Sequence, residues 1–147
     1  MASMRALDKC KKEGKAVLVF PSGTRYRPGH SETRQGLREI DSYLRLFDVM
    51  ILVSINGSCL RINTEAPEDM LADLVCQDTV IMSASPVIEC KKFRDDIMSS
   101  LPDSMDDKKP AVVQKIMDML KEQHDAQQSA YLQAYKNETG KDSDYYV

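Results

Sequence analysis

The chain has no tryptophan, two histidines and only three phenylalanines among its 147 residues. Binders of single-stranded nucleic acid interleave aromatic and basic side chains, so this scarcity of aromatics argues against nucleic acid as a partner. No run of about 18 apolar residues occurs, so we expect no segment to span a bilayer. The charged N-terminus, MASMRALDKCKKEGK, lacks the apolar stretch of a signal peptide, and we expect a cytoplasmic protein.

Several motifs of metal and nucleotide sites are also absent. The four cysteines are widely spaced and form no C-x-x-C pair (Cys10, Cys59, Cys76 and Cys90). The spacing of metal ligands is therefore missing, and reduced thiols in a cytosolic protein are expected. Neither G-x-x-x-x-G-K-[ST] nor G-x-G-x-x-G occurs, which excludes the common nucleotide-binding loops.

The composition is that of a globular chain, with 42% hydrophobic and 29% charged residues. Its length suits one domain with a real core. Charge is uneven, because residues 1–47 hold ten Lys/Arg against five Asp/Glu, whereas residues 48–147 hold ten against eighteen. The N-terminal third could therefore attract an anion, although its lysines between residues 9 and 15 could equally be a solvated helix face.

Hydrophobic periodicity predicts strands and helices that alternate along much of the chain. The apolar runs KAVLVF and VMILVSI are typical of buried strands, and the first is typical of a strand covered on both faces. Strands are expected at 15–20, 49–55, 59–62 and 79–84. Helices are expected at 3–13, 33–47, 65–76, 93–101 and from Pro110 onward.

The order strand, helix, strand over residues 15–55 is a βαβ unit, so its two strands are expected to be parallel. The predicted fold class is therefore α/β, with a partial mixed or parallel sheet and flanking helices. We expect an α/β domain over residues 1–109, a C-terminal helix over 110–136 and a flexible tail over 137–147.

The segment F-P-S-G-T-R-Y-R follows the first predicted strand, where α/β sheets commonly bind ligands. Gly23 allows the backbone to approach a ligand, Thr24 offers a hydroxyl, and Arg25 offers a planar fork for phosphate or carboxylate oxygens. Arg27 and Arg34 could add charge nearby. The turn predicts an anion site, and the alternative is an ordinary polar loop whose arginines are solvated.

G-K-A-V-L-V-F-P-S-G-T-R-Y-R resembles the third motif block of the glycerolipid acyltransferases, which reads F-P-E-G-T-R-S-R after a strand. The following Gln35-Gly36-Leu37 segment and the apolar run at 49–55 match the family's next helix and strand. The resemblance covers roughly residues 3–62. It implies the C-terminal half of an enzyme domain that transfers an acyl group to glycerol 3-phosphate or lysophosphatidate in phospholipid biosynthesis.

The resemblance also implies a set of site residues and partners. The acceptor phosphate would be bound by Ser22, Gly23, Thr24, Arg25 and Arg27. No bound cofactor is implied, because acyl-coenzyme A or an acyl carrier protein is the donor. The full-length protein would lie peripherally on the cytoplasmic membrane.

The chain departs from this family in three ways. Ser22 stands where the family has Glu, the prolines of the fourth block are absent, and no H-x-x-x-x-D motif occurs. Gln35 lies five residues after His30, and Ser129 lies five residues after His124. In the family that His is the general base and the Asp orients it. The chain therefore holds no catalytic residue and is expected to be inactive alone.

Two acidic clusters remain, one with Glu68, Asp69 and Asp73 and one with Asp103, Asp106 and Asp107. Their spacing is not that of a calcium loop, so we interpret both as solvated charge and expect no metal. The alternative function is a non-catalytic α/β module that binds phosphate or another anion through the Ser22–Arg27 turn.

Overall fold

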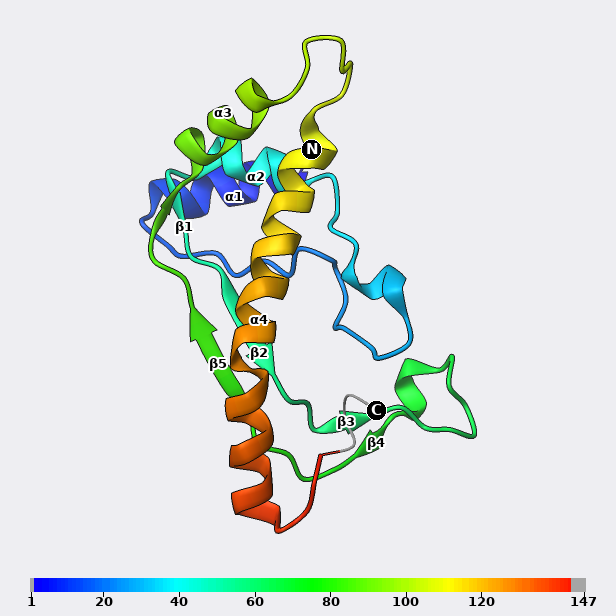
Figure 1. Ribbon diagram of the computed structural model, residues 1–147. Helices are drawn as coiled ribbons and strands as arrows, with labels where there is room; N and C mark the ends of the chain where they lie inside the picture. Colours follow the sequence, from blue (N-terminus) through cyan, green and yellow to red (C-terminus); the bar gives the residue numbers. More distant parts are fainter. Residues whose placement is uncertain (1, 144–147) are drawn as a thin grey trace.

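The computed structural model describes residues 2–143, which fold into a mixed α/β structure (Figure 1). Its helices are α1 (Ala2–Lys12), η1 (Ser31–Arg34), α2 (Ile40–Leu46), η2 (Met70–Ala72), α3 (Cys90–Ser100) and α4 (Lys109–Thr139), where η marks a 3-10 helix. Its strands are β1 (Val49–Met50), β2 (Val53–Asn56), β3 (Leu60–Arg61), β4 (Leu74–Val75), β5 (Ile81–Ala84) and β6 (Ile88–Glu89).

Helix α4 is the long element of the fold and packs along β2 and β5 (Figure 1). Pro110 lies in its first turn, where proline's missing N–H costs nothing. Gly140 ends the helix in the left-handed conformation, with φ of 70°. The predicted C-terminal helix is present and extends beyond Lys136 to Thr139, whereas the predicted tail residues 144–147 lie outside the described part of the chain.

Among the described residues, the strands pair only as antiparallel couples: β1 with β6, β2 with β5, and β3 with β4. The prediction of parallel first strands is wrong, because residues 15–20 form no strand. Leu18 and Phe20 are 80% and 62% exposed. A strand needs a neighbour for its backbone N–H and C=O groups, and an apolar run does not specify that neighbour.

Two predicted helices are shorter than the periodicity indicated. The helix predicted at 33–47 is divided into η1 and α2, and the chain between them approaches α4 closely. A Cβ on Gly36 would lie 2.4 Å from Val113 Cγ1. The helix predicted at 65–76 is reduced to η2, and its last residues form strand β4 instead. The Asp69 carboxylate caps η2 by accepting a hydrogen bond from the Leu71 N–H.

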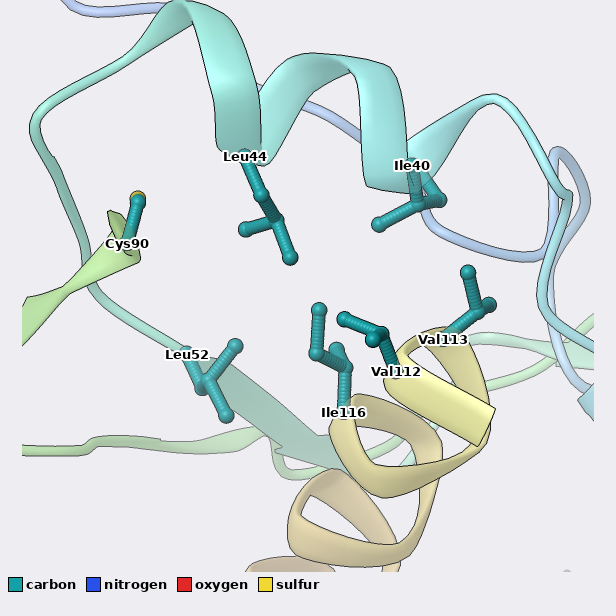
Figure 2. Packing of buried hydrophobic residues seen from close by; sticks show 7 residues of the cluster. All are labelled: Ile40, Leu44, Leu52, Cys90, Val112, Val113 and Ile116. Atoms are coloured by element: carbon teal, nitrogen blue, oxygen red, sulfur yellow. The ribbon is translucent and has the colours of Figure 1, made fainter. Parts of the chain in front are cut away.

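The main hydrophobic core lies where α2, α3 and the first turns of α4 meet (Figures 1 and 2). Figure 2 shows side chains from α2 and α4 pointing toward one another, with those of Leu52 and Cys90 beside them. The cluster consists of Ile40, Leu44, Leu52, Cys90, Val112, Val113 and Ile116. Burial raises the pKa of the Cys90 thiol, and the nearby Asp48 carboxylate adds to that shift.

The helices formed by the described residues include none that is long and apolar enough to cross a bilayer. The β3–β4 pair lies away from the helical core, toward the C-terminal end of α4, and the loop that follows α1 extends from the core toward that pair (Figure 1). Arg25 and Arg27 of this loop form ion pairs with Asp73, the residue before β4. These ion pairs form the site described next.

Candidate anion-binding site

The turn that the sequence singled out is held by its own hydrogen bonds. The Gly23 N–H donates to the Phe20 carbonyl oxygen at 2.9 Å, and the Ser22 hydroxyl donates to the Thr24 carbonyl oxygen at 2.7 Å. Gly23 has φ of 70°, and a Cβ there would lie 2.9 Å from Leu37 Cδ1. Glycine therefore suits this position for both its backbone angle and its close packing.

Arg25 and Arg27 extend from this turn to a single carboxylate, that of Asp73. Arg27 Nη2 lies 2.8 Å from Asp73 Oδ1, and Arg25 Nη2 forms an ion pair with Asp73 Oδ2. The Asp73 side chain is 1% exposed, so its charge is shielded from water. Two guanidinium groups that converge on one anion form the local arrangement expected of a carboxylate or phosphate site.

The two arginines are unequally accessible. The Arg27 side chain is 3% exposed, and that of Arg25 is 28% exposed. The Arg27 backbone N–H donates to Thr33 Oγ1 at 3.0 Å, which fixes the residue in the loop. Its Nε is buried and has no hydrogen-bond partner among the described residues. Arg25 is therefore the more accessible of the two arginines, and Arg27 is buried.

Asp73 is the site residue that the sequence analysis missed. We interpreted it as solvated charge, and the structure shows that this is wrong, because Asp73 is buried against two arginines. Its neighbours in the chain are Leu71, Ala72, Leu74 and Val75. Leu71, Leu74 and Val75 are themselves exposed, so these apolar neighbours do not indicate that Asp73 is buried. The identity of its arginine partner, 46 residues away, could not be deduced from the sequence.

The other predicted residues lie around this ion-pair cluster. The Thr24 hydroxyl lies 4.0 Å from the sulfur of Met70, in η2. The Arg34 guanidinium does not join Arg25 and Arg27 but stacks over the Tyr26 ring, 3.9 Å from its centroid. The turn is therefore in contact with the segment from Met70 to Asp73.

Each histidine lies near a carboxylate that is close to it in the chain, and neither pair belongs to an H-x-x-x-x-D sequence. His30 Nδ1 is 3.2 Å from Glu32 Oε1, two residues along the chain. His124 Nδ1 is 3.3 Å from Asp125 Oδ1, its immediate neighbour, on the distant helix α4. No group of three or more potential metal ligands is found within residues 2–143. A surface hollow near α2 and α3 includes none of the predicted site residues.

Comparison of the chain with protein-family models, with curated proteins and with solved structures gave no match. The local geometry of the Ser22–Arg27 turn and its contacts with Asp73 are therefore the basis for a functional interpretation.

Proposed function

We propose that this chain is the C-terminal part of a glycerolipid acyltransferase and that its Ser22–Arg27 turn binds the phosphate of a glycerol phosphate acceptor. The observation that supports this function is the convergence of Arg25 and Arg27 on one anionic group, Asp73. The G-T-R sequence of the turn is that of the family's phosphate-binding block.

Asp73 occupies the guanidinium groups that the phosphate needs, so acceptor binding displaces this carboxylate from at least Arg25. A phosphate offers more oxygens and more negative charge than a carboxylate, which favours the exchange. Arg25 is the more exposed of the two arginines and makes the direct contact. Arg27 remains buried and supplies a second positive charge.

Each of the smaller residues has a role in this proposal. Gly23 and Thr24 shape the turn, and the Ser22 hydroxyl, already bonded to the Thr24 carbonyl oxygen, stiffens it. Ser22 replaces the family's Glu and leaves the turn without that negative charge. The acyl donor is a thioester of coenzyme A or of a carrier protein.

The general base comes from an upstream polypeptide that carries the H-x-x-x-x-D motif. The chain alone is therefore inactive in acyl transfer, and the complete enzyme lies peripherally on the cytoplasmic membrane. Sequencing the DNA upstream of Met1 tests this part of the proposal. An H-x-x-x-x-D block in frame, or in a neighbouring frame, supports it, whereas upstream DNA without the block contradicts it.

The phosphate site is tested by calorimetric titration of the chain with sn-glycerol 3-phosphate and with inorganic phosphate. We expect binding that prefers glycerol 3-phosphate and that weakens about tenfold or more in Arg25→Ala, because a hydrogen bond to a charged group contributes about 1.5–3 kcal/mol. Asp73→Asn removes the competing charge while keeping the side-chain shape. We expect this variant to bind more tightly than the unchanged chain.

Arg38→Ala is the matched control, since it removes an arginine whose side chain is 65% exposed and paired with Asp107. Its affinity should equal that of the unchanged chain. Equal binding in Arg25→Ala and Arg38→Ala would contradict the phosphate site. Circular dichroism of each variant checks that the fold is retained.

A non-catalytic anion-binding module is the second candidate, because Asp73 and the arginines form a complete ion-pair cluster without a catalytic histidine. This candidate expects equal affinity for inorganic phosphate and glycerol 3-phosphate. A preference for glycerol 3-phosphate therefore distinguishes the acyltransferase from the simple module.

A further inference from the structure

Two of the four cysteines face each other across the β3–β4 ladder. The register pairs Leu60 with Val75 and Arg61 with Leu74, so the next pair outward is Cys59 with Cys76. The Cys76 N–H donates to the Cys59 carbonyl oxygen at 2.8 Å, which extends the ladder to this pair. Residues directly opposite in an antiparallel pair place their side chains on the same face of the sheet.

The Cα spacing expected for such a pair lies within the range that disulfides show. The Cα atoms of a hydrogen-bonded antiparallel pair are about 5.5 Å apart. Disulfides join residues whose Cα atoms are about 4.4–6.8 Å apart. We propose that Cys59 and Cys76 form a reversible intrachain disulfide when the protein meets a small-molecule disulfide. This modification site is independent of the acyltransferase proposal.

A buried carboxylate holds the ladder in the register that the disulfide needs. Asp78 is fully buried and follows Cys76 by two residues. It accepts hydrogen bonds from the Ser58 N–H at 2.7 Å, from Arg61 Nη1 at 3.0 Å and from the Tyr131 hydroxyl at 3.0 Å. Ser58 and Arg61 flank the Cys59 side of the pair. Asp78 therefore joins both strands to helix α4 and helps to hold the register in which Cys59 lies opposite Cys76.

Exposure favours reaction at Cys59 over the other cysteines, since Cys10 and Cys76 are half-buried and Cys90 is buried. Cys59 is exposed and Cys76 is half-buried, so a reagent reaches Cys59 first and Cys76 can then resolve the product. Cys90 is 1% exposed in the helical core, and burial raises the pKa of its thiol. Cys10 lies in α1, outside the β3–β4 ladder. Thiolate fraction and access together control such exchange.

The reaction needs only the two thiols and one small disulfide, such as oxidised glutathione. The Cys59 thiolate attacks one sulfur of the reagent, breaks its S–S bond and releases one thiol as a mixed disulfide forms. The Cys76 thiolate then attacks Cys59 Sγ and releases the second thiol. The protein loses two electrons and two protons, and the reagent gains them as two thiols.

The disulfide would close the loop of residues 60–75, which carries Asp73 at its end. Closing a loop restricts how far its residues can separate from their native positions. Oxidation should therefore reduce local opening of this loop, including opening that would release Asp73 from the arginines. This effect is measurable as slower cleavage after Glu65 and Glu68 by a glutamate-specific protease.

The test uses the folded full chain, reduced and then incubated with oxidised glutathione. We expect the count of free thiols to fall from four to two, with the intact mass lower by two hydrogen atoms and no glutathione retained. Cys59→Ser and Cys76→Ser should each abolish the disulfide. Cys10→Ser is the control and should still lose two thiols. Cleavage of the loop should slow on oxidation in the unchanged chain and in Cys10→Ser.

Three results would overturn the proposal. The first is a folded chain that keeps all four thiols, and the second is a stable glutathione adduct on Cys59 that Cys76 does not resolve. The third is a disulfide that survives in Cys59→Ser, which would show another pairing. Oxidation in concentrated guanidinium chloride is the control for the role of the fold. The unfolded chain should form a mixture of disulfides among its four cysteines rather than the Cys59–Cys76 disulfide alone.

Discussion

In most two-faced strand pairs the apolar side chains are buried and the polar ones are exposed. The β2–β5 pair largely reverses this arrangement. The face toward α4 carries three polar side chains beside Ile81: Ser54 and Ser83 share a hydrogen bond of 2.8 Å, and Asn56 donates to the His124 carbonyl oxygen at 2.9 Å. The other face carries apolar ones, with Ile55 47% and Met82 64% exposed. Burial therefore does not follow hydrophobicity in these strands.

This comparison shows what a continuous apolar run can and cannot specify. Such a run is typical of a strand that is covered on both faces. Helix α4 covers one face, and the described residues leave the apolar side chains of the other face open. The polar groups tolerate burial because they hydrogen-bond to one another and to α4.

The largest expected loss of stability comes from truncating an isoleucine in the core, compared with one on the open face of the β2–β5 pair. Ile116 is 3% exposed and belongs to the helical core. Ile116→Ala should lower the free energy of unfolding by about 2–5 kcal/mol, because it removes buried methyl groups and leaves a cavity. Ile55→Ala should lower it by less than about 1 kcal/mol. Chemical unfolding followed by circular dichroism measures both, and equal losses would contradict the comparison.

Gly57, at the end of β2, tests how closely the chain packs against α4. Its φ is 93°, and a Cβ would lie 2.2 Å from the Thr79 carbonyl oxygen and 2.8 Å from Tyr131 Cε2. Gly57→Ala should lower the free energy of unfolding by more than about 1 kcal/mol. Gly29 also has positive φ but open space around it, so Gly29→Ala measures the backbone strain alone. A loss no larger than that of Gly29→Ala would show that the close packing is absent.

The pH dependence of stability should reveal the ionisation of Tyr131, which is buried in α4. Burial raises the pKa of Tyr131 to about 12, and its contact with Asp78 adds to the shift. The unfolded chain releases this proton near pH 10, so the folded state holds more protons between about pH 10 and 12. The melting temperature should therefore fall across this range. Tyr131→Phe should reduce the slope, and an unchanged slope would contradict the assignment.

The smallest change in stability should come from polar substitutions on the open face. The double variant Val53→Thr and Ile55→Thr keeps β-branched side chains, and we expect its free energy of unfolding to change by about 1 kcal/mol or less. Its binding of a fluorescent dye for apolar surfaces should fall. Dye binding that does not change would show that this face is not the apolar surface that the dye detects.

Parts of the fold could be predicted from periodicity because they depend on local pattern. The stripe of Val113, Ile116 and Leu120 predicted α4, and the run at 79–84 predicted the strand that the structure shows as β5. The run at 15–20 has the same character and forms no strand. Strand formation depends on a partner's backbone groups, which the segment's own residues do not encode.

The candidate site also has a part that the sequence predicts and a part that only the structure shows. The Ser22–Arg27 turn was identified from its own residues, since glycine, hydroxyl and guanidinium groups each carry a chemical capability wherever they lie. Asp73, Asp78 and the opposition of Cys59 to Cys76 depend on contacts between distant segments. No pattern among neighbouring residues predicts those contacts.

The amino-acid sequence by itself determined which side chains can bind an anion, which runs are apolar and that a long helix begins near Pro110. These properties belong to single residues or to neighbours a few positions apart. Tertiary structure decided that Asp73 forms ion pairs with both arginines, that Arg27 is buried and that polar rather than apolar groups of β2 face α4. The reason is that burial and charge pairing depend on which distant segments meet, and that is a property of the whole folded chain.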